Sequence, residues 1–263
     1  MNKIDVLFLD LDGTLLDTGV GQWAKISKNN QEAVCNFSKI GKVVISTGRS
    51  FTWHVRKIAE SVNASFLVCQ NGSLIYDKNF HKIKDKKISS SVVDSIFQIA
   101  KQFKASIVAN SSFFIYGPFF WNRFFSIFSS FKAKKYTDFK PYETNKILLI
   151  HKSQKKINKI FSEIKKHFKD EVSVEIVGKN WAIEITRKDC SKGIAAKEIA
   201  KILNVDLKNT IHIGDSMNDS STKNIVGKLI AVKSGSKKLK KIADEIGPKR
   251  RNAGIAKIIK KFI

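Results

Sequence analysis

The most constraining feature of the sequence is a largely apolar run, residues 4–9, which leads into Asp10-Leu11-Asp12-Gly13-Thr14. An apolar run that ends in a glycine-containing turn predicts a buried β-strand. Side chains alternate across a strand, so we expect Asp10 and Asp12 to face the same side. In an open α/β sheet, ligands bind beyond the carboxyl ends of the strands, where this turn would lie. The structural alternative is an acidic turn that only closes the first strand.

Three later stretches favour a ligand site over a simple turn. Residues 43–46 form a second apolar run that ends in Thr47-Gly48-Arg49, where a hydroxyl can donate a hydrogen bond to an oxyanion. Ser191-Lys192-Gly193 precedes a helical pattern, and residues 211–214 form a third apolar run that ends in Asp215-Ser216-Met217-Asn218-Asp219. An unpaired carboxylate near an apolar core is costly, so two such strands ending in aspartate predict a divalent cation.

Taken in this order, the motifs resemble those of the haloacid dehalogenase-like hydrolases, and most closely the Cof-type phosphatases with a class IIB cap. The resemblance runs over nearly the whole chain and implies an α/β fold, with a doubly wound, parallel-sheet, Rossmann-like core and an inserted α+β cap domain. The stretches that carry it are Asp10 to Leu15, Thr47-Gly48-Arg49, Asn71-Gly72, Ser191-Lys192-Gly193 and Gly214 to Asp219.

The resemblance implies a catalytic role for each of the main motif residues. Asp10 would be the nucleophile that forms an aspartyl-phosphate, and Asp12 would be the general acid and base. Thr47 and Lys192 would hold the transferring phosphoryl group. Mg²⁺ would be bound by Asp10, Asp215 and the backbone carbonyl of Asp12.

The remaining motif residues are expected around this centre. Asp219 belongs to the expected metal site, where it would orient the water shell or Lys192. Gly48, Arg49, Asn71 and Asn218 are expected near the phosphate or the substrate. Each has a structural alternative: Asn71 and Asn218 as turn formers, Arg49 in a salt bridge, and Asp219 with Asp215 as an Asx-type turn and helix cap.

Local signals add smaller expectations. Asn29 is predicted to cap a helix, with Glu32 three residues on, and another helix is predicted from about Ser50 to Ser61. Two positions depart from the family pattern. Asp189 stands close enough in sequence to divert Lys192, and the polar residues 220–224 predict a short or frayed helix.

The chain is predicted to form two domains, because 263 residues exceed a typical single domain. Residues 1–83 and 188–263 show the strand–helix alternation of a parallel sheet and would form the discontinuous core. In residues 84–187, two helix–strand–strand patterns predict an antiparallel sheet covered on one face by helices, which would be the cap. Its aromatic segment 113–125 could line a substrate pocket, make a partner surface or fill the cap core.

The net charge of +25 would ordinarily indicate nucleic acid or an anionic membrane as partner. Only six of the 48 basic residues are arginine, however, and arginine is the preferred residue for bidentate phosphate and guanine contacts. We therefore expect no nucleic-acid or membrane partner and attribute most of the charge to a lineage bias toward lysine. A cytoplasmic protein is predicted, because the sequence shows no signal peptide and no bilayer-spanning run and has an odd number of widely spaced cysteines, Cys35, Cys69 and Cys190.

The predicted function is a Mg²⁺-dependent phosphatase that acts on small phosphorylated metabolites. Sugar phosphates, flavin mononucleotide and pyridoxal phosphate-like monoesters all remain open as substrates, and the sequence predicts no oligomeric state. One alternative is a phosphomutase, which returns the phosphoryl group to a sugar phosphate instead of to water. Another is a basic protein that binds nucleic acid or membrane and retains a vestigial fold.

Overall fold

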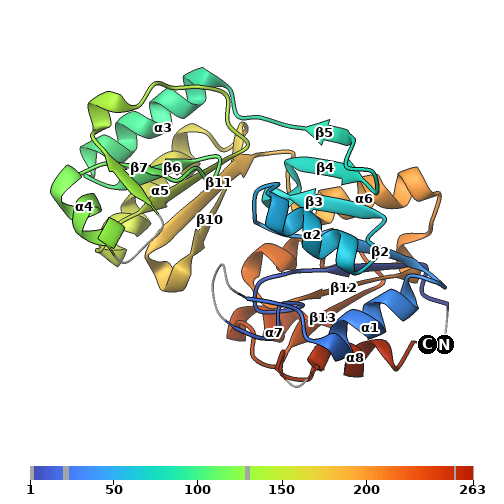
Figure 1. Ribbon diagram of the computed structural model, residues 1–263. Helices are drawn as coiled ribbons and strands as arrows, with labels where there is room; N and C mark the ends of the chain where they lie inside the picture. Colours follow the sequence, from blue (N-terminus) through green and yellow to red (C-terminus); the bar gives the residue numbers. More distant parts are fainter. Residues whose placement is uncertain (1–2, 20–23, 128–130, 252, 263) are drawn as a thin grey trace. The chain divides into compact units, whose positions relative to one another are not determined.

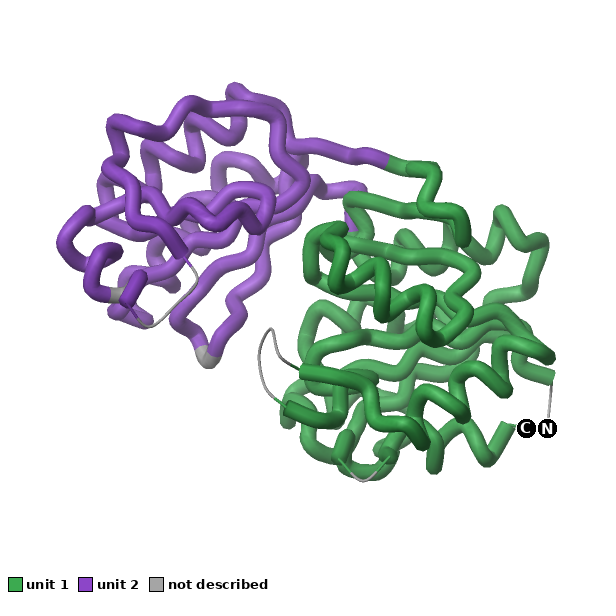
Figure 2. The backbone as a smooth tube through the Cα atoms, in the orientation of Figure 1, with its two compact units in different colours: residues 1–84, 191–263 green, residues 85–190 purple. Residues whose placement is uncertain are grey.

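The computed structural model describes residues 3–19, 24–127, 131–251 and 253–262, and it divides into two compact units (Figure 1). The first unit comprises residues 1–84 and 191–263, and the second comprises residues 85–190 (Figure 2). Among the described residues, no helix is both long and apolar enough to cross a membrane.

The first unit is built on a sheet that has eight strands within the described part of the chain, in the order β14-β13-β12-β1-β2-β3-β4-β5. Neighbours from β14 to β3 pair in parallel, and β4 runs antiparallel to β3. The strands are β1 (Val6–Leu9), β2 (Lys42–Ser46), β3 (Phe66–Cys69), β4 (Leu74–Asp77), β5 (Lys82–Asp85), β12 (Thr210–Gly214), β13 (Lys228–Val232) and β14 (Glu245–Gly247).

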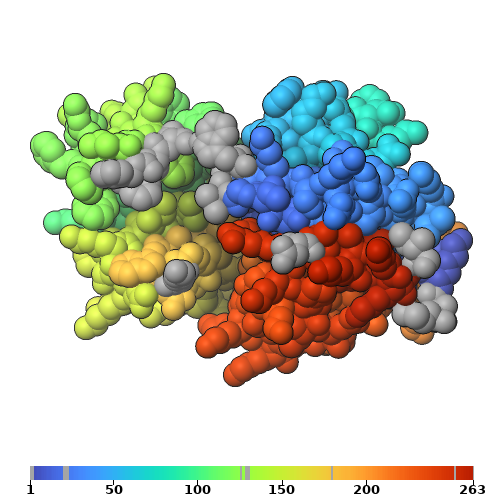
Figure 3. Space-filling view, turned by 60° about the horizontal axis from the view of Figure 1, so that its bottom comes forward, coloured from blue at the N-terminus to red at the C-terminus, as the bar shows by residue number. Residues whose placement is uncertain are grey.

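Helices cover both faces of this sheet, as in a doubly wound fold. Val43 and Ile45 of β2 pack in a cluster with α1 (Lys28–Phe37), α2 (Trp53–Ser61) and α8 (Gly254–Ile259). Val44, between them, packs with α6 (Lys192–Leu203) on the opposite face. The alternation of buried side chains along one strand therefore supports two helical layers. Helix α1 contacts α8, and Figure 3 shows the blue N-terminal part beside the red C-terminal part.

The remaining elements of the first unit are short. They are α7 (Lys237–Ile242) and the 3₁₀ helices η2 (Gln70–Gly72), η5 (Leu207–Asn209) and η6 (Met217–Thr222). The 3₁₀ helix η6 confirms the prediction of a short helix there, because hydroxyl and amide side chains compete with the backbone for hydrogen bonds. Strand β14 was not predicted, and it is only three residues long.

Two predicted helix starts in the first unit are wrong. Helix α1 begins at Lys28 with Ser27, not Asn29, as its cap: the Ser27 hydroxyl accepts a hydrogen bond from the backbone N–H of Asn30. Asp17 holds Ser27 in place by accepting from its backbone N–H and its hydroxyl, both at 2.7 Å. Helix α2 begins at Trp53, where the Thr52 hydroxyl serves as the cap.

The second unit has a sheet of six strands within the described residues, in the order β10-β11-β9-β6-β7-β8. Its strands are β6 (Ser106–Ala109), β7 (Phe114–Tyr116), β8 (Lys132–Lys134), β9 (Lys146–Ile150), β10 (Val172–Val177) and β11 (Ala182–Arg187). Its helices are α3 (Ser90–Gln102), α4 (Phe119–Ile127), α5 (Gln154–His167) and the 3₁₀ helices η3 (Tyr136–Asp138) and η4 (Gly178–Asn180).

The packing of the second unit is that of an α+β layer structure. Ile107, Leu149 and Ile183 of the central strands share one buried cluster with the apolar side chains of α3 and α5. Neighbouring strands are antiparallel except at the edge, where β7 and β8 pair in parallel. The predicted fold class, an α/β parallel-sheet core with an α+β insertion, is confirmed. A fully antiparallel sheet is wrong at this edge, because α4 separates β7 from β8 and lets the chain return in the same direction.

Candidate active site

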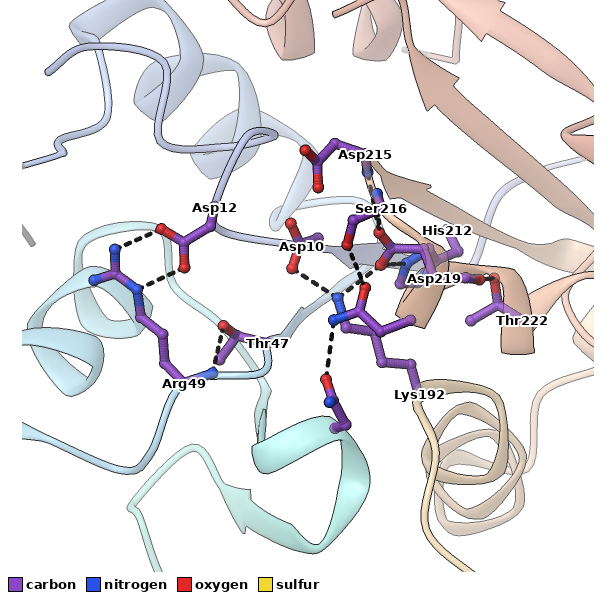
Figure 4. Close-up of polar contacts among 12 residues, drawn as sticks. Asp10, Asp12, Thr47, Arg49, Lys192, His212, Asp215, Ser216, Asp219 and Thr222 are labelled. Atoms are coloured by element: carbon purple, nitrogen blue, oxygen red, sulfur yellow. Dashed lines mark hydrogen bonds and ion pairs between the residues drawn. The ribbon is translucent and has the colours of Figure 1, made fainter. Parts of the chain in front are cut away.

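The candidate site forms where three neighbouring parallel strands end. Strand β1 lies between β12 and β2, with Leu9 in register with Ile213 and with Ile45. Because parallel strands present their carboxyl ends at the same edge of a sheet, the residues that follow them come together. Asp10 and Asp215 directly follow β1 and β12, and Thr47 follows β2. Figure 4 shows these side chains with Lys192 from the first turn of α6.

A buried lysine connects two of the predicted carboxylates. The Nζ of Lys192 donates to Asp10 Oδ1 and to Asp219 Oδ1, each at 2.7 Å, and Lys192 is only 1% exposed. Burial disfavours the charged ammonium, but the carboxylates of Asp10 and Asp219 outweigh it and raise the pKa of Lys192. Lys192 therefore carries a positive charge next to Asp10.

Burial acts in the opposite direction on the carboxyl groups. It is the largest cause that raises the pKa of Asp10, with Asp219 and Asp215 adding to the rise and Lys192 opposing it. Burial and Asp219 also raise the pKa of Asp215, to about 7. The site thus concentrates more negative charge than Lys192 alone stabilises, which is the electrostatic condition for cation binding.

Asp219 is held by donors on both of its oxygens. Its Oδ1 accepts from Lys192 and from His212 Nε2 at 2.8 Å, and its Oδ2 accepts from the backbone N–H groups of Asp215 and Ser216, each at 3.0 Å. These positive and N–H partners overcome burial and lower the pKa of Asp219. Asp219 is therefore ionised, and its hydrogen bonds hold Lys192, His212 and the backbone at Asp215 and Ser216 in position.

His212 belongs to this network although the sequence analysis did not select it. It lies on β12, is fully buried, and carries its proton on Nε2, since the ionised Asp219 can only accept. Burial lowers the pKa of His212 and favours the neutral ring. The available signal was a histidine in the middle of an apolar strand, two residues before Gly214.

The donor set suits a hard divalent cation. Ligand oxygens of Asp10, Asp215 and Asp219 lie within 4.8 Å of one another. Carboxylate oxygens are preferred ligands of Mg²⁺. Gly13, at φ +80°, makes room for this cluster: a Cβ there would stand 2.2 Å from Asp215 Oδ2. Because both oxygens of Asp219 already accept from protein donors, Asp10 and Asp215 fit the role of ligand best.

Asp12 has different partners from Asp10. Arg49 binds its carboxylate through both oxygens, with Nε to Oδ2 at 2.7 Å and Nη2 to Oδ1 at 2.6 Å. The Asp12 side chain is 52% exposed, whereas that of Asp10 is buried. Strand β1 ends at Leu9, so the alternation expected for the two aspartates does not continue through the turn. Figure 4 shows Asp12 directed toward Arg49 and Asp10 toward Lys192.

Four further predicted residues lie after β2 or in η2 and η6: Thr47, Gly48, Asn71 and Asn218. The hydroxyl oxygen of Thr47 accepts from the backbone N–H of Arg49 at 3.1 Å, so its proton remains available to an anion. Asn71, in the left-handed region at φ 55°, accepts at Oδ1 from Asn218 Nδ2 at 3.0 Å. Gly48 leaves space for this amide, since a Cβ would stand 3.1 Å from Asn71 Oδ1.

Asp189 does not divert Lys192. It pairs with Arg187 at 2.9 Å and with Lys86 at 3.3 Å, within the second unit. Partial burial would raise the pKa of Asp189, but these two cations outweigh it and lower the pKa. Lys192 keeps Asp10 and Asp219 as its partners.

The chain is similar in sequence to known proteins over nearly its whole length. The model of a protein family described as haloacid dehalogenase-like hydrolase matches residues 7–259. A Mycoplasma pneumoniae protein named "Putative phosphatase" is 30% identical, with 94% of this chain and 93% of that protein covered. The 5-amino-6-(5-phospho-D-ribitylamino)uracil phosphatase YcsE of Bacillus subtilis is 26% identical, with 99% of this chain and 96% of that protein covered.

Solved structures show the same fold. A phosphatase of the haloalkanoate enzyme superfamily from Bacteroides thetaiotaomicron superposes with a TM-score of 0.81 at 19% identity, covering 99% of this chain and 95% of that one. A sugar phosphatase of subclass IIB superposes with a TM-score of 0.80 at 18% identity, covering 98% of both chains.

Proposed function

Since this chain belongs to the haloacid dehalogenase-like hydrolases and is a phosphatase of that family, we propose that it hydrolyses small phosphorylated metabolites through an aspartyl-phosphate on Asp10. The observation that carries the proposal is the buried contact between Lys192 Nζ and Asp10 Oδ1 at the carboxyl end of β1. It places a positive charge where an anionic nucleophile must meet an anionic phosphate ester.

In the first step, an oxygen of Asp10 attacks phosphorus as the bond from phosphorus to the leaving oxygen breaks. Oδ1 accepts from Lys192, which leaves Oδ2 without a protein partner among the described residues and suited to the attack. Lys192 and the Thr47 hydroxyl stabilise the charge on the transferring phosphoryl oxygens. The leaving oxygen takes its proton from Asp12.

In the second step, water attacks the phosphorus of the aspartyl-phosphate, and Asp12 accepts the proton of that water. Inorganic phosphate leaves and the Asp10 carboxylate is restored. Both steps need Asp12 within reach of the reacting oxygens, and in this structure Arg49 holds it. A carboxyl group that carries the proton cannot accept through both oxygens as a carboxylate does, so we expect the two-bond contact with Arg49 to open when Asp12 acts as the acid.

We propose Mg²⁺ as the cation of the acidic cluster, held by Asp10, Asp215 and the backbone carbonyl of Asp12. When bound, Mg²⁺ neutralises charge on the nucleophile and on the phosphate oxygens. Asp219 contributes indirectly, because it fixes Lys192 and the backbone at Asp215 and Ser216.

Two of the similar proteins suggest a class of substrate for this chain. The Bacillus subtilis relative is named a 5-amino-6-(5-phospho-D-ribitylamino)uracil phosphatase, and one of the similar solved structures is called a sugar phosphatase. We propose a polyol or sugar phosphate for this chain, with flavin mononucleotide and pyridoxal phosphate as further candidates. The second unit, residues 85–190, would be the class IIB cap that reads the part of the substrate other than the phosphate. The three cysteines, none of which forms a disulfide in the described part of the chain, fit action in the reducing cytoplasm.

Release of inorganic phosphate from a panel of phosphorylated metabolites, with Mg²⁺ present, tests the proposal. Asp10→Asn should abolish release, and Asp189→Asn, which alters a carboxylate outside the site, should not. Transfer of phosphate between positions of a sugar without net release would instead indicate a phosphomutase. Full activity of Asp10→Asn would contradict the assignment of the nucleophile.

A further inference from the structure

The second unit holds a cavity that the proposed chemistry does not use. Its volume is about 340 Å³, toward the lower end of the range for small-molecule pockets. It lies where β9 ends at Ile150 and the chain turns into α5, and Trp121 of α4 forms part of its wall. Trp121 belongs to the aromatic segment 113–125, whose role the sequence left open.

The charged side chains that line this cavity are all positive. Lys104, Lys152 and Lys156 line it, and no carboxylate does so among the described residues. Ser153, also in the lining, is the N-cap of α5, a helix of 14 residues with no acidic residue in its first turn. The amino end of a helix favours anions through its unpaired N–H groups and its dipole.

A largely buried histidine in the cavity wall offers an N–H group as a hydrogen-bond donor. His151 lines the cavity and is only 9% exposed. Its Nδ1 accepts from the backbone N–H of Ser153 at 2.8 Å, so in the neutral ring Nε2 carries the proton. Burial, together with Lys156, lowers the pKa of His151 and favours that neutral form. No hydrogen bond of Nε2 is found within the part of the chain that the structure describes, so this N–H is available to an acceptor that enters the cavity.

Trp121 adds a flat apolar wall. It is 47% exposed, so part of its indole is accessible. Lys152 Nζ lies over this ring, 5.1 Å from its centre. A planar anion that packs on the indole would therefore share the ring with this cation or displace it, and in both cases meet its charge.

We propose that this cavity binds a small organic anion, with its carboxylate or phosphate held by Lys152, Lys156 and the Nε2–H of His151 and a planar ring packed on Trp121. Such a ligand accepts from His151, offsets the charge of the lysines and packs on the indole at once. All residues that line the cavity belong to the second unit, and none of them is among the residues assigned to hydrolysis.

The test uses the full chain with Trp23, Trp53 and Trp181 changed to phenylalanine, which leaves Trp121 as its one tryptophan. The probe is phenylphosphonate, a ring-bearing anion that a phosphatase cannot hydrolyse. In this background, Lys152→Gln/Lys156→Gln is compared with Lys155→Gln/Lys159→Gln, which removes the same charge from residues lining a different cavity. We expect saturable quenching of Trp121, with Kd at least about tenfold higher in the first pair and unchanged in the second.

Measurements of KM show whether the bound anion is part of the substrate or a separate molecule. If the cavity takes the non-reacting part of a substrate, Lys152→Gln/Lys156→Gln raises KM for para-carboxyphenyl phosphate but not for phenyl phosphate. If the ligand is a separate metabolite, both KM values stay unchanged while phenylphosphonate binding is lost. No response of Trp121, or an equal response in the two double variants, would overturn the proposal. Because fluorescence reports binding without turnover, this failure is distinct from failure of the phosphatase assignment.

Discussion

At the scale of single residues, the site gives different surroundings to the two aspartates that lie only two positions apart in the sequence. Asp10 lies buried against Lys192, and Asp12 lies in a half-exposed ion pair with Arg49. A buried carboxylate next to a fixed cation suits a nucleophile, whose position must not change. A carboxylate near solvent suits an acid and base that must exchange protons with water.

Asp12→Asn should therefore reduce turnover most for substrates whose leaving group is most basic. Loss of the general acid costs most where the leaving oxygen needs a proton, typically a factor of about 10² to 10⁴. We expect alkyl phosphates to lose far more kcat than para-nitrophenyl phosphate, measured side by side under saturating Mg²⁺. An equal loss on both esters would argue against the acid role.

His212→Phe should lower kcat with little change in KM. The variant removes the donor from Asp219 while keeping a ring of similar shape on β12. A hydrogen bond to a charged group contributes about 1.5–3 kcal/mol. If roughly half of it serves to position Lys192, kcat falls about tenfold. His167→Phe, at an exposed position on α5, is the matched control, and unchanged kcat in His212→Phe would reject the positioning role.

At the scale of elements, close approach between backbones sets the position of Lys192. A Cβ on Gly193 would stand 1.9 Å from the carbonyl oxygen of Ser221, so α6 packs directly on η6. The hydroxyl of Ser221 also accepts from the backbone N–H of Gly193 at 3.2 Å. Glycine at this position thus lets the start of α6 bring Lys192 to Asp219.

Gly193→Ala should both destabilise the protein and impair catalysis. Forcing α6 away from η6 is a case of overpacking, with a typical cost of about 1–3 kcal/mol. Urea unfolding should show a lower midpoint, and the folded fraction should have lower kcat. Lys201→Ala, at an exposed position of the same helix, should leave both unchanged. A fully stable and active Gly193→Ala would contradict the close packing.

The elements themselves were largely predictable, because apolar periodicity and motif order are local properties of the sequence. The helix caps were less so: Ser27 caps α1 with the support of Asp17, ten residues away. Among the site residues, the sequence indicated which side chains follow the strands. It could not indicate that Arg49 binds Asp12, or that His212 joins Asp219, because such partners are chosen by three-dimensional packing.

At the scale of the whole molecule, the active site depends on contacts between distant parts of the chain. Lys192 and Asp10 are 182 residues apart in sequence, and the entire second unit is inserted between them. Strand β1, between β12 and β2, brings the two halves of the core together. The proposed metal site can therefore assemble only when the two halves of the core have come together.

Mg²⁺ should therefore stabilise the folded protein as well as support activity. A ligand that binds only the folded state raises stability by mass action, by about 2.7 kcal/mol at a hundredfold excess over Kd. EDTA should abolish turnover and lower Tm, and added Mg²⁺ should restore both. Asp215→Asn should lose most of this Mg²⁺-dependent rise in Tm, whereas Asp244→Asn should keep it. Turnover that persists in EDTA would contradict the metal site.

The central claim, that Asp10 carries the phosphoryl group, is tested most directly by acid quench during turnover followed by peptide mass spectrometry. The account predicts one added phosphoryl group on the peptide that contains Asp10. The modified fraction should be larger in Asp12→Asn, where attack by water lacks its base, and absent in Asp10→Asn. Steady release of phosphate with no modified peptide in either the wild-type protein or Asp12→Asn would contradict it.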